Sequence, residues 1–139
     1  MAIPRALRDA LGEQLGAPVE AAAPVYGGDI NQAARIEAGG TPYFVKWSDG
    51  APPAMFPAEA YGLRLLRAPG AIRVPEVVAQ GDADGDCPAY LVLEWIETGS
   101  RRGDRDAAME RFGTALAALH RVEADAHGLD RDNFIGRLP

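Results

Sequence analysis

The chain has 139 residues, of which 20 are acidic and 14 are basic, so its formal net charge is -6. This length fits one domain or two small lobes. The excess of acids argues against a general nucleic-acid-binding surface, which needs clustered basic residues. The one cysteine, Cys87, cannot form an internal disulfide, as is typical of a reducing compartment. No run approaches the ~20 apolar residues of a membrane span, and the charged N-terminus is unlike a signal peptide, so we expect a cytoplasmic protein.

Apolar residues at every fourth position predict a first helix over residues 4–15, with Pro4 at its first position. The residues of this stripe are Ile3, Leu7, Leu11 and Leu15. Gly16 and Pro18 are expected to end the helix.

Alternating and turn-bounded segments predict five strands in the remainder of the first hundred residues. Their expected ranges are 19–25, 33–38, 43–47, 74–81 and 90–96. A turn at 39–42 joins the second strand to the third as a hairpin. The fifth strand begins with apolar residues on both faces, so we expect it to be central.

Two more helices are predicted, one on each side of a polar linker. The second helix is expected over 57–67, after a Gly- and Pro-containing loop at 48–56. The linker covers 98–106, and either Asp104 or Asp106 can cap the third helix. That helix is expected to run to about Val122. Its expected apolar face consists of Phe112, Leu116 and Leu119.

The clearest functional signal lies in residues 25–47. Gly27 and Gly28 lack a Cβ, so the backbone there can turn sharply and approach a ligand, and unpaired amides in such a loop can cradle phosphates. The third strand then presents Lys46, the one lysine among 14 basic residues. A lysine on the third strand behind a Gly loop is typical of protein-kinase-like folds. The alternative is a solvent-facing lysine on an ordinary hairpin.

Glu59 is the only acid of the predicted second helix, and its spacing places it on one face with Leu63 and Leu66. A carboxylate on an apolar face needs a cation, because an unpaired buried charge is costly. We therefore predict an ion pair between Glu59 and Lys46. The alternative is an exposed glutamate that the helix dipole favours in the first turn.

Several other polar residues are assigned no catalytic or metal-binding role. The acidic turn at 81–86 lacks the final glutamate of a calcium-binding loop. Asp130 stands three residues after His127, and Asn133 three after Asp130, whereas a kinase catalytic loop places its Asp two after the His and its Asn five after the Asp. We expect His120 to be structural and assign no role to Cys87.

The order of elements and several short motifs resemble the fructosamine kinase (ketosamine-3-kinase) family. The motifs are Gly27-Gly28-Asp29-Ile30-Asn31, Tyr43-Phe44-Val45-Lys46, Met55-Phe56 before Ala58-Glu59-Ala60, Val74-Pro75, Leu91-Val92-Leu93-Glu94, Leu116 to His120, and Gly128 to Gly136. No single motif is specific, but their order and spacing cover nearly the whole chain. Aminoglycoside and choline phosphotransferases share the lobe plan and match these motifs less well.

The resemblance implies an α+β fold. Residues 1–97 would form a protein-kinase-like N-lobe, with a five-stranded antiparallel sheet, an αC-type helix and an additional N-terminal helix. Residues 98–139 would form a linker and the first helix of a C-lobe.

The resemblance also implies roles in binding ATP. The Gly loop would cover the phosphates through Gly27, Gly28, Asp29, Ile30 and Asn31. Lys46, held by Glu59, would contact α/β-phosphate oxygens. Backbone groups of Glu94 and Ile96 would contact adenine, with Leu93 behind the ring and Trp95 between them. Some family members carry Cys where Asp29 stands, so redox control through that position is not implied for this chain.

Family members phosphorylate the sugar 3-hydroxyl of ketoamines, an activity that counts as protein deglycation repair. Their catalytic and Mg²⁺-binding residues lie in a His-Gly-Asp segment, with a following Asn and a later Asp, that this sequence does not contain. We therefore predict no catalytic or metal-binding residue here, Mg²⁺ only in the complete enzyme, and no phosphate transfer by this chain alone.

The main interpretation is an N-terminal part of a fructosamine kinase. One alternative is a non-catalytic lobe that binds a nucleotide or a partner. Another is a fragment of a related aminoglycoside or choline phosphotransferase-like kinase. The third helix would pack on a C-lobe in a complete enzyme, whereas a functional short form would cover it with a partner or by self-association.

Overall fold

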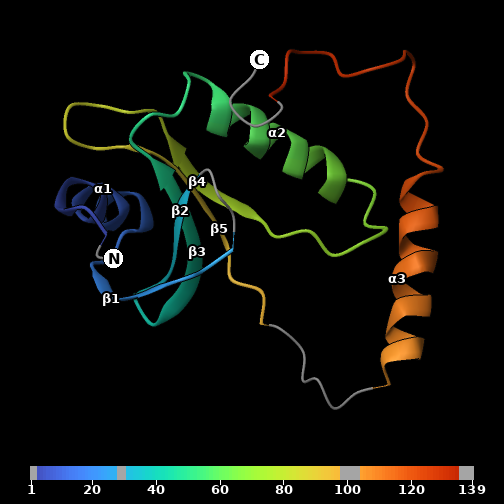
Figure 1. Cartoon of the computed structure of the whole chain (residues 1–139), viewed down its shortest axis with the longest axis horizontal. Helices are drawn as coiled ribbons and strands as arrows, with labels where there is room; N and C mark the ends of the chain where they lie inside the picture. The colour runs from blue at the N-terminus through green and yellow to red at the C-terminus, as the bar shows by residue number, and fades with distance from the viewer. Residues whose placement is uncertain (1–2, 28–30, 98–103, 135–139) are drawn as a thin grey trace.

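The computed structural model describes residues 3–27, 31–97 and 104–134 (Figure 1). The described part contains a five-stranded sheet and three helices. In chain order these are α1 (Arg5–Leu15), β1 (Val19–Pro24), β2 (Gln32–Ala38), β3 (Thr41–Ser48), α2 (Met55–Arg67), β4 (Val77–Gly81), β5 (Ala89–Glu94) and α3 (Arg105–Leu119). None of these helices is both long and apolar enough to cross a membrane.

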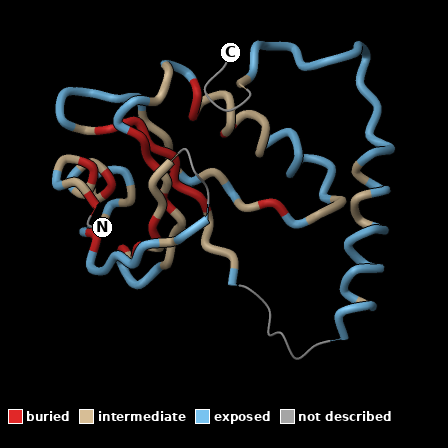
Figure 2. The backbone as a smooth tube through the Cα atoms, in the orientation of Figure 1, coloured by how far each residue is buried: buried red, intermediate tan, exposed pale blue. Residues whose placement is uncertain are grey.

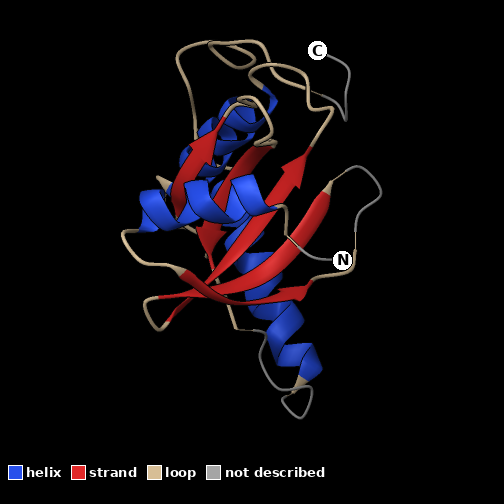
Figure 3. Ribbon diagram, turned by 90° about the vertical axis from the view of Figure 1, so that its left-hand side faces the viewer, coloured by secondary structure: helices blue, strands red, loops and turns tan. Residues whose placement is uncertain are grey.

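The five strands form one antiparallel sheet in the order β1-β2-β3-β5-β4, and Figure 3 shows its twist. β5 lies between β3 and β4, so the prediction that it is an internal strand is confirmed. All of its residues before Glu94 are buried, which explains why its sequence is apolar on both faces. The predicted five-stranded antiparallel sheet is present.

The first helix covers one face of this sheet. Its residues Leu7 and Leu11 are fully buried, as the four-residue stripe predicted, and they belong to a core cluster with side chains from four strands. The strand members of this cluster are Val19, Ala34, Ile36, Val45, Trp47, Tyr90 and Val92. Gly16 ends the helix in the left-handed conformation, with φ of 68°, which glycine adopts at little cost.

The second helix covers the opposite face. Met55, Phe56 and Ala60 of α2 form a second core cluster with strand residues of β5. Side chains alternate between the two faces along a strand, so Val45 and Trp47 of β3 face α1, whereas Lys46 faces α2. Figure 2 shows that the buried residues concentrate in the sheet and in the helix surfaces next to it.

The predicted inward face of the second helix is confirmed at Leu63, which packs against the second core cluster, and is wrong at Leu66. Leu66 is 45% exposed, whereas Phe56 is only 1% exposed. The helix begins at Met55 rather than at residue 57, after Ala54 with φ of 65°. Pro57 is tolerated inside the first turn because the amides there have no partner within the helix.

Other element boundaries also differ from the predicted ones. Pro4 precedes the first helical residue instead of occupying that position. β4 begins at Val77 rather than at residue 74, because Pro75 has no amide hydrogen to donate to a neighbouring strand. β5 ends at Glu94 rather than at residue 96, and α3 ends at Leu119 instead of near residue 122.

The third helix begins at a side-chain cap, as predicted. The carboxylate of Asp104 accepts hydrogen bonds from the amides of Asp106 and Ala107. No residue of α3 is buried, and Met109 and Phe112 are at least half exposed. Figure 2 shows this helix to one side of the sheet, exposed over most of its length. Self-association through α3 stays a prediction.

Candidate functional site

Lys46 and Glu59 form the predicted ion pair. The ammonium nitrogen of Lys46 lies 2.9 Å from Oε1 and 2.8 Å from Oε2 of Glu59. The two side chains are 19% and 34% exposed, so the pair is shielded from water without being sealed from it. The ring of Phe56 lies under the ammonium, with its centroid 5.6 Å away.

The geometry follows from the sheet and the helix that carry the two residues. Val45 and Trp47, the strand neighbours of Lys46, are buried in the core on the α1 side of the sheet. Because side chains alternate along a strand, Lys46 points toward α2. Glu59 precedes the buried Ala60 on α2, so it stands at the border between the core and the surface of that helix. A partly buried pair of this kind keeps more of its Coulomb attraction than a fully exposed one.

A pocket of about 390 Å³ opens beside the ion pair. Its walls come from the end of the Gly loop, β3, α2 and the C-terminal segment. The lining residues are Asn31, Lys46, Met55, Ala58, Glu59, Gly62, Leu63, Leu66, Asn133 and Phe134. Leu66 therefore lies at the pocket rather than in the core. Among the described residues, the buried Oδ1 of Asn31 has no hydrogen-bond partner.

Only the two ends of the predicted Gly loop can be placed. Gly27 has φ of 133°, and the position of a Cβ there would be open space, so this glycine is required for its backbone conformation. Asn31 lies at the pocket. Gly28, Asp29 and Ile30 lie outside the described residues, and their predicted contacts with phosphates stay a prediction.

The segment predicted to contact adenine lies at the end of β5. Leu93 is buried in the α2-side core, whereas Trp95 and Ile96 follow the strand and are half-buried. The amide of Glu94 already donates to the carbonyl of Glu76, at 2.8 Å. The amide of Glu94 is therefore already used within the sheet, and the predicted contacts of Glu94 and Ile96 with adenine stay a prediction. The indole of Trp95 donates to Glu97.

The side chain of Glu94 has a role that the sequence did not reveal. Its carboxylate accepts a hydrogen bond from Arg73 at 2.7 Å and one from the amide of Glu76 at 3.2 Å. Arg67 of α2 lies 3.6 Å away. The hydrogen bond from Arg73, the amide of Glu76 and the nearby positive charges hold the pKa of Glu94 below its usual value. Glu94 thus links the end of β5 to the end of α2.

This network predicts a loss of stability in acid. In the unfolded chain Glu94 protonates near its ordinary pKa of 4.5, whereas in the folded chain it protonates at lower pH. Its contribution is present above the ordinary value and disappears as the pH falls through the folded pKa. Replacing Glu94→Gln is expected to lower the urea midpoint at neutral pH.

The difference between this variant and the parent chain should shrink below about pH 4.5, where the parent loses the same interaction. Circular dichroism at a series of pH values measures both midpoints. Glu110→Gln, on the exposed surface of α3, is the matched control. A gap between Glu94→Gln and the parent that is constant down to acid pH would contradict the proposed role of the carboxylate.

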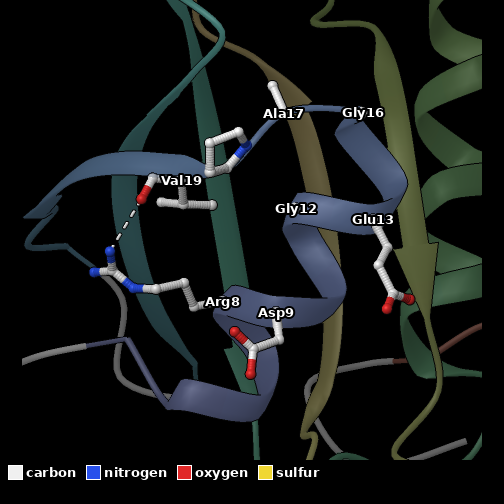
Figure 4. A pocket seen from close by; sticks show the side chains of 8 residues that line it. Arg8, Asp9, Gly12, Glu13, Gly16, Ala17 and Val19 are labelled. Carbon is white, nitrogen blue, oxygen red and sulfur yellow. Dashed lines mark hydrogen bonds between the residues drawn. The ribbon is translucent and has the colours of Figure 1, made fainter.

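Another pocket lies between α1 and the start of β1 (Figure 4). The guanidinium of Arg8 donates to the carbonyl of Val19 across it, at 3.0 Å. Asp9 and Glu13 lie at its rim and are exposed. None of the predicted site residues lines this pocket.

The residues to which the sequence analysis assigned no catalytic role make contacts typical of structural residues. The carboxylate of Asp130 accepts a hydrogen bond from Tyr61, and His120 follows the last turn of α3, where its amide donates to the carbonyl of Leu116. Burial, with the nearby charge of Asp84, raises the pKa of the Cys87 thiol, which lowers its thiolate fraction. In the described part of the chain, no three His, Cys, Asp or Glu residues cluster closely enough to hold a metal ion.

Comparison with known proteins gives consistent matches. The sequence profile of the family described as fructosamine kinase matches residues 3–139. A protein of Synechocystis sp. named a probable ketoamine kinase is 43% identical over 116 residues, which cover 83% of this chain and 38% of that protein. The chloroplastic protein-ribulosamine 3-kinase of Arabidopsis thaliana is 32% identical over 117 residues, covering 83% of this chain and 34% of that one.

A crystal structure from Thermobifida fusca, of a protein assigned as a fructosamine-3-kinase, matches with a TM-score of 0.76. The two chains are 32% identical, and the match covers 99% of this chain and 46% of that one. The chain thus spans less than half the length of each of these three relatives. Since the family profile extends over nearly all of the sequence, the chain belongs to the fructosamine kinase family and has the sheet and helix arrangement of a protein-kinase-like N-lobe.

Proposed function

We propose that this chain binds ATP as the N-lobe of a fructosamine or ketosamine-3-kinase. The observation that carries the proposal is the Lys46–Glu59 ion pair, which joins the third strand to the helix behind it. Protein kinases use the same pairing to hold a lysine against nucleotide phosphates. The kinase names of the relatives point to the same chemistry.

The residues at the pocket fit a nucleotide. Lys46 would donate hydrogen bonds to phosphate oxygens while Glu59 fixes the direction of its side chain. The buried Oδ1 of Asn31, which has no partner among the residues that the structure describes, would accept a hydrogen bond from a ligand hydroxyl or a bound water, since an unsatisfied buried acceptor is costly. The backbone of Glu94 and Ile96 would hold the adenine, against Leu93 and beside Trp95.

Transfer of the phosphoryl group makes further demands. Kinases of this type require Mg²⁺, which would supply neutralisation of the charge that develops on the phosphates of ATP. The attacking hydroxyl must also be oriented by an acidic residue. No acid in this sequence has the spacing of a kinase catalytic loop, so we expect these functions to lie outside it. The acceptor we propose is the sugar 3-hydroxyl of a ketoamine, which makes protein deglycation in the cytoplasm the corresponding biological role.

The test is a titration of the ¹⁵N-labelled chain with ATP, followed by amide chemical shifts. Shifts are expected at Asn31, Lys46 and Ile96. Adenosine should reproduce only the shifts near Ile96, and inorganic triphosphate only those near Lys46, because each carries one half of the ligand. Shifts confined to residues 127–134 would count against ATP binding at this site.

A further inference from the structure

The segment Gly128–Phe134 returns to the second helix, far from it in sequence. The hydroxyl of Tyr61 on α2 donates a hydrogen bond to Asp130, which stands 69 residues later. The guanidinium of Arg131 lies 3.5 Å above the centre of the Tyr61 ring, within the range of a cation–π contact. Figure 1 shows the chain passing from α3 back to α2 before its C-terminal end.

The same segment also reaches the site. Phe134 packs against the core cluster that contains Met55 and Phe56, and Asn133 and Phe134 line the pocket of the ion pair. One end of the segment therefore holds the outer surface of α2 at Tyr61. Its other end fills space beside Lys46 and Glu59.

These contacts bear on the orientation of α2. Tyr61 lies two residues after Glu59, on the same helix and near its middle, so a contact that fixes one side chain limits rotation of the other about the helix axis. On the buried face of α2, Ala60 lies next to Glu59, with Phe56 one turn before and Leu63 one turn after, against the same core. This apolar face holds α2 on the sheet, and the contacts of Tyr61 restrain the helix from its outer surface.

We propose that residues 128–134 are a positioning segment, anchored on Tyr61, that holds α2 in the orientation in which Glu59 reaches Lys46. The inference rests on the proposed function only in assigning the ion pair to nucleotide binding. The contacts of Tyr61, Asp130 and Phe134 are observed whether or not the chain binds a nucleotide. Loss of the anchor leaves α2 folded and the ion pair more often open.

Lys46 gives a direct measurement, because it is the only lysine in the chain. Acylation of its side chain by an N-hydroxysuccinimide ester can be followed by mass spectrometry on the peptide that contains it. A side-chain nitrogen held against two carboxylate oxygens and only 19% exposed reacts slowly, since the reagent must reach it. Tyr61→Ala is expected to raise the acylation rate about tenfold, the effect of losing a charge-assisted hydrogen bond and a stacked arginine together.

Two milder variants separate positioning from loss of packing. Tyr61→Phe keeps the ring, and Asp130→Asn changes only an exposed side chain, so each should raise the rate by less than Tyr61→Ala. Their effects should not add in the double variant, because both act on the same hydrogen bond: Tyr61→Phe removes its donor, and Asp130→Asn replaces its charged acceptor with a weaker, neutral one. Tyr43→Phe and Asp132→Asn are matched controls expected to react at the parent rate. Glu59→Gln removes the negative charge of the ion pair, so its acylation rate is the reference for an open pair.

The urea midpoint of each variant shows whether it remains folded. A folded Asp130→Asn chain that acylates at the parent rate, together with a Tyr61→Phe chain that does the same, would overturn the proposal. The outcome is independent of nucleotide. If ATP causes no amide shifts in the parent chain but the Tyr61 variants are acylated faster, only the proposed function is refuted. If ATP causes the expected shifts but the variants are acylated at the parent rate, only the positioning segment is refuted.

Discussion

Replacing Lys46 with alanine is expected to weaken ATP binding by about 10- to 100-fold. A hydrogen bond to a charged group contributes about 1.5–3 kcal/mol, and each 1.4 kcal/mol changes a dissociation constant about tenfold. The substitution also leaves Glu59 facing the pocket without its cation, and a carboxylate there repels phosphates. Both effects act in the same direction.

Isothermal titration calorimetry with ATP and with adenosine measures the effect and assigns it. Adenosine has no phosphate, so its affinity should be the same for the parent chain and for Lys46→Ala. Arg111→Ala removes one positive charge from the exposed surface of α3 and is the control for net charge. Equal losses of ATP and adenosine affinity would show that Lys46 supports the fold of the lobe rather than the phosphate site.

The ion pair could be predicted from the sequence because both of its residues follow local rules. Alternation along β3 places Lys46 opposite the core side chains Val45 and Trp47, and helical spacing places Glu59 near the inward face of α2. Neither inference needed the position of any distant residue. The structure confirmed the pair at 2.8 Å.

The inward face of α2 was predicted less well because its start was misplaced. Because proline is favoured at the first helical position, the sequence predicts a start at Pro57 and leaves Phe56 in the preceding loop. The predicted face of Glu59, Leu63 and Leu66 is confirmed only in part: Leu63 packs on the core, whereas Leu66 is 45% exposed. With the helix beginning at Met55, the buried positions are Phe56 and Ala60, and Leu66 moves to the pocket.

The contact between Tyr61 and Asp130 could not be predicted at all. The local pattern around Asp130 is its spacing from His127 and Asn133, and this spacing does not point to Tyr61. The direction in which the chain returns after α3 depends on packing that no local pattern encodes. A tyrosine on a helix surface and an aspartate in a turn are each ordinary by themselves, and only the fold brings them together.

Replacing Phe56 with alanine is expected to destabilise the lobe by about 3–5 kcal/mol, the usual cost of removing a buried phenylalanine. Phe56 is 1% exposed and stands at the centre of the α2-side core. Its loss also removes the ring beneath the Lys46 ammonium. Small domains are stable by only about 5–15 kcal/mol in total, so this loss is a large share of the free energy of unfolding.

Urea unfolding followed by circular dichroism gives the free energy of unfolding of each variant. Leu65→Ala is the matched control, because it shortens an apolar side chain on the same helix that is 41% exposed, and alanine favours the helix. That control should differ from the parent by less than about 1 kcal/mol. Similar midpoints for Phe56→Ala and Leu65→Ala would mean that α2 is not held on the sheet through Phe56. The orientation of Glu59 toward Lys46 would then depend on the ion pair and on the segment that contacts Tyr61.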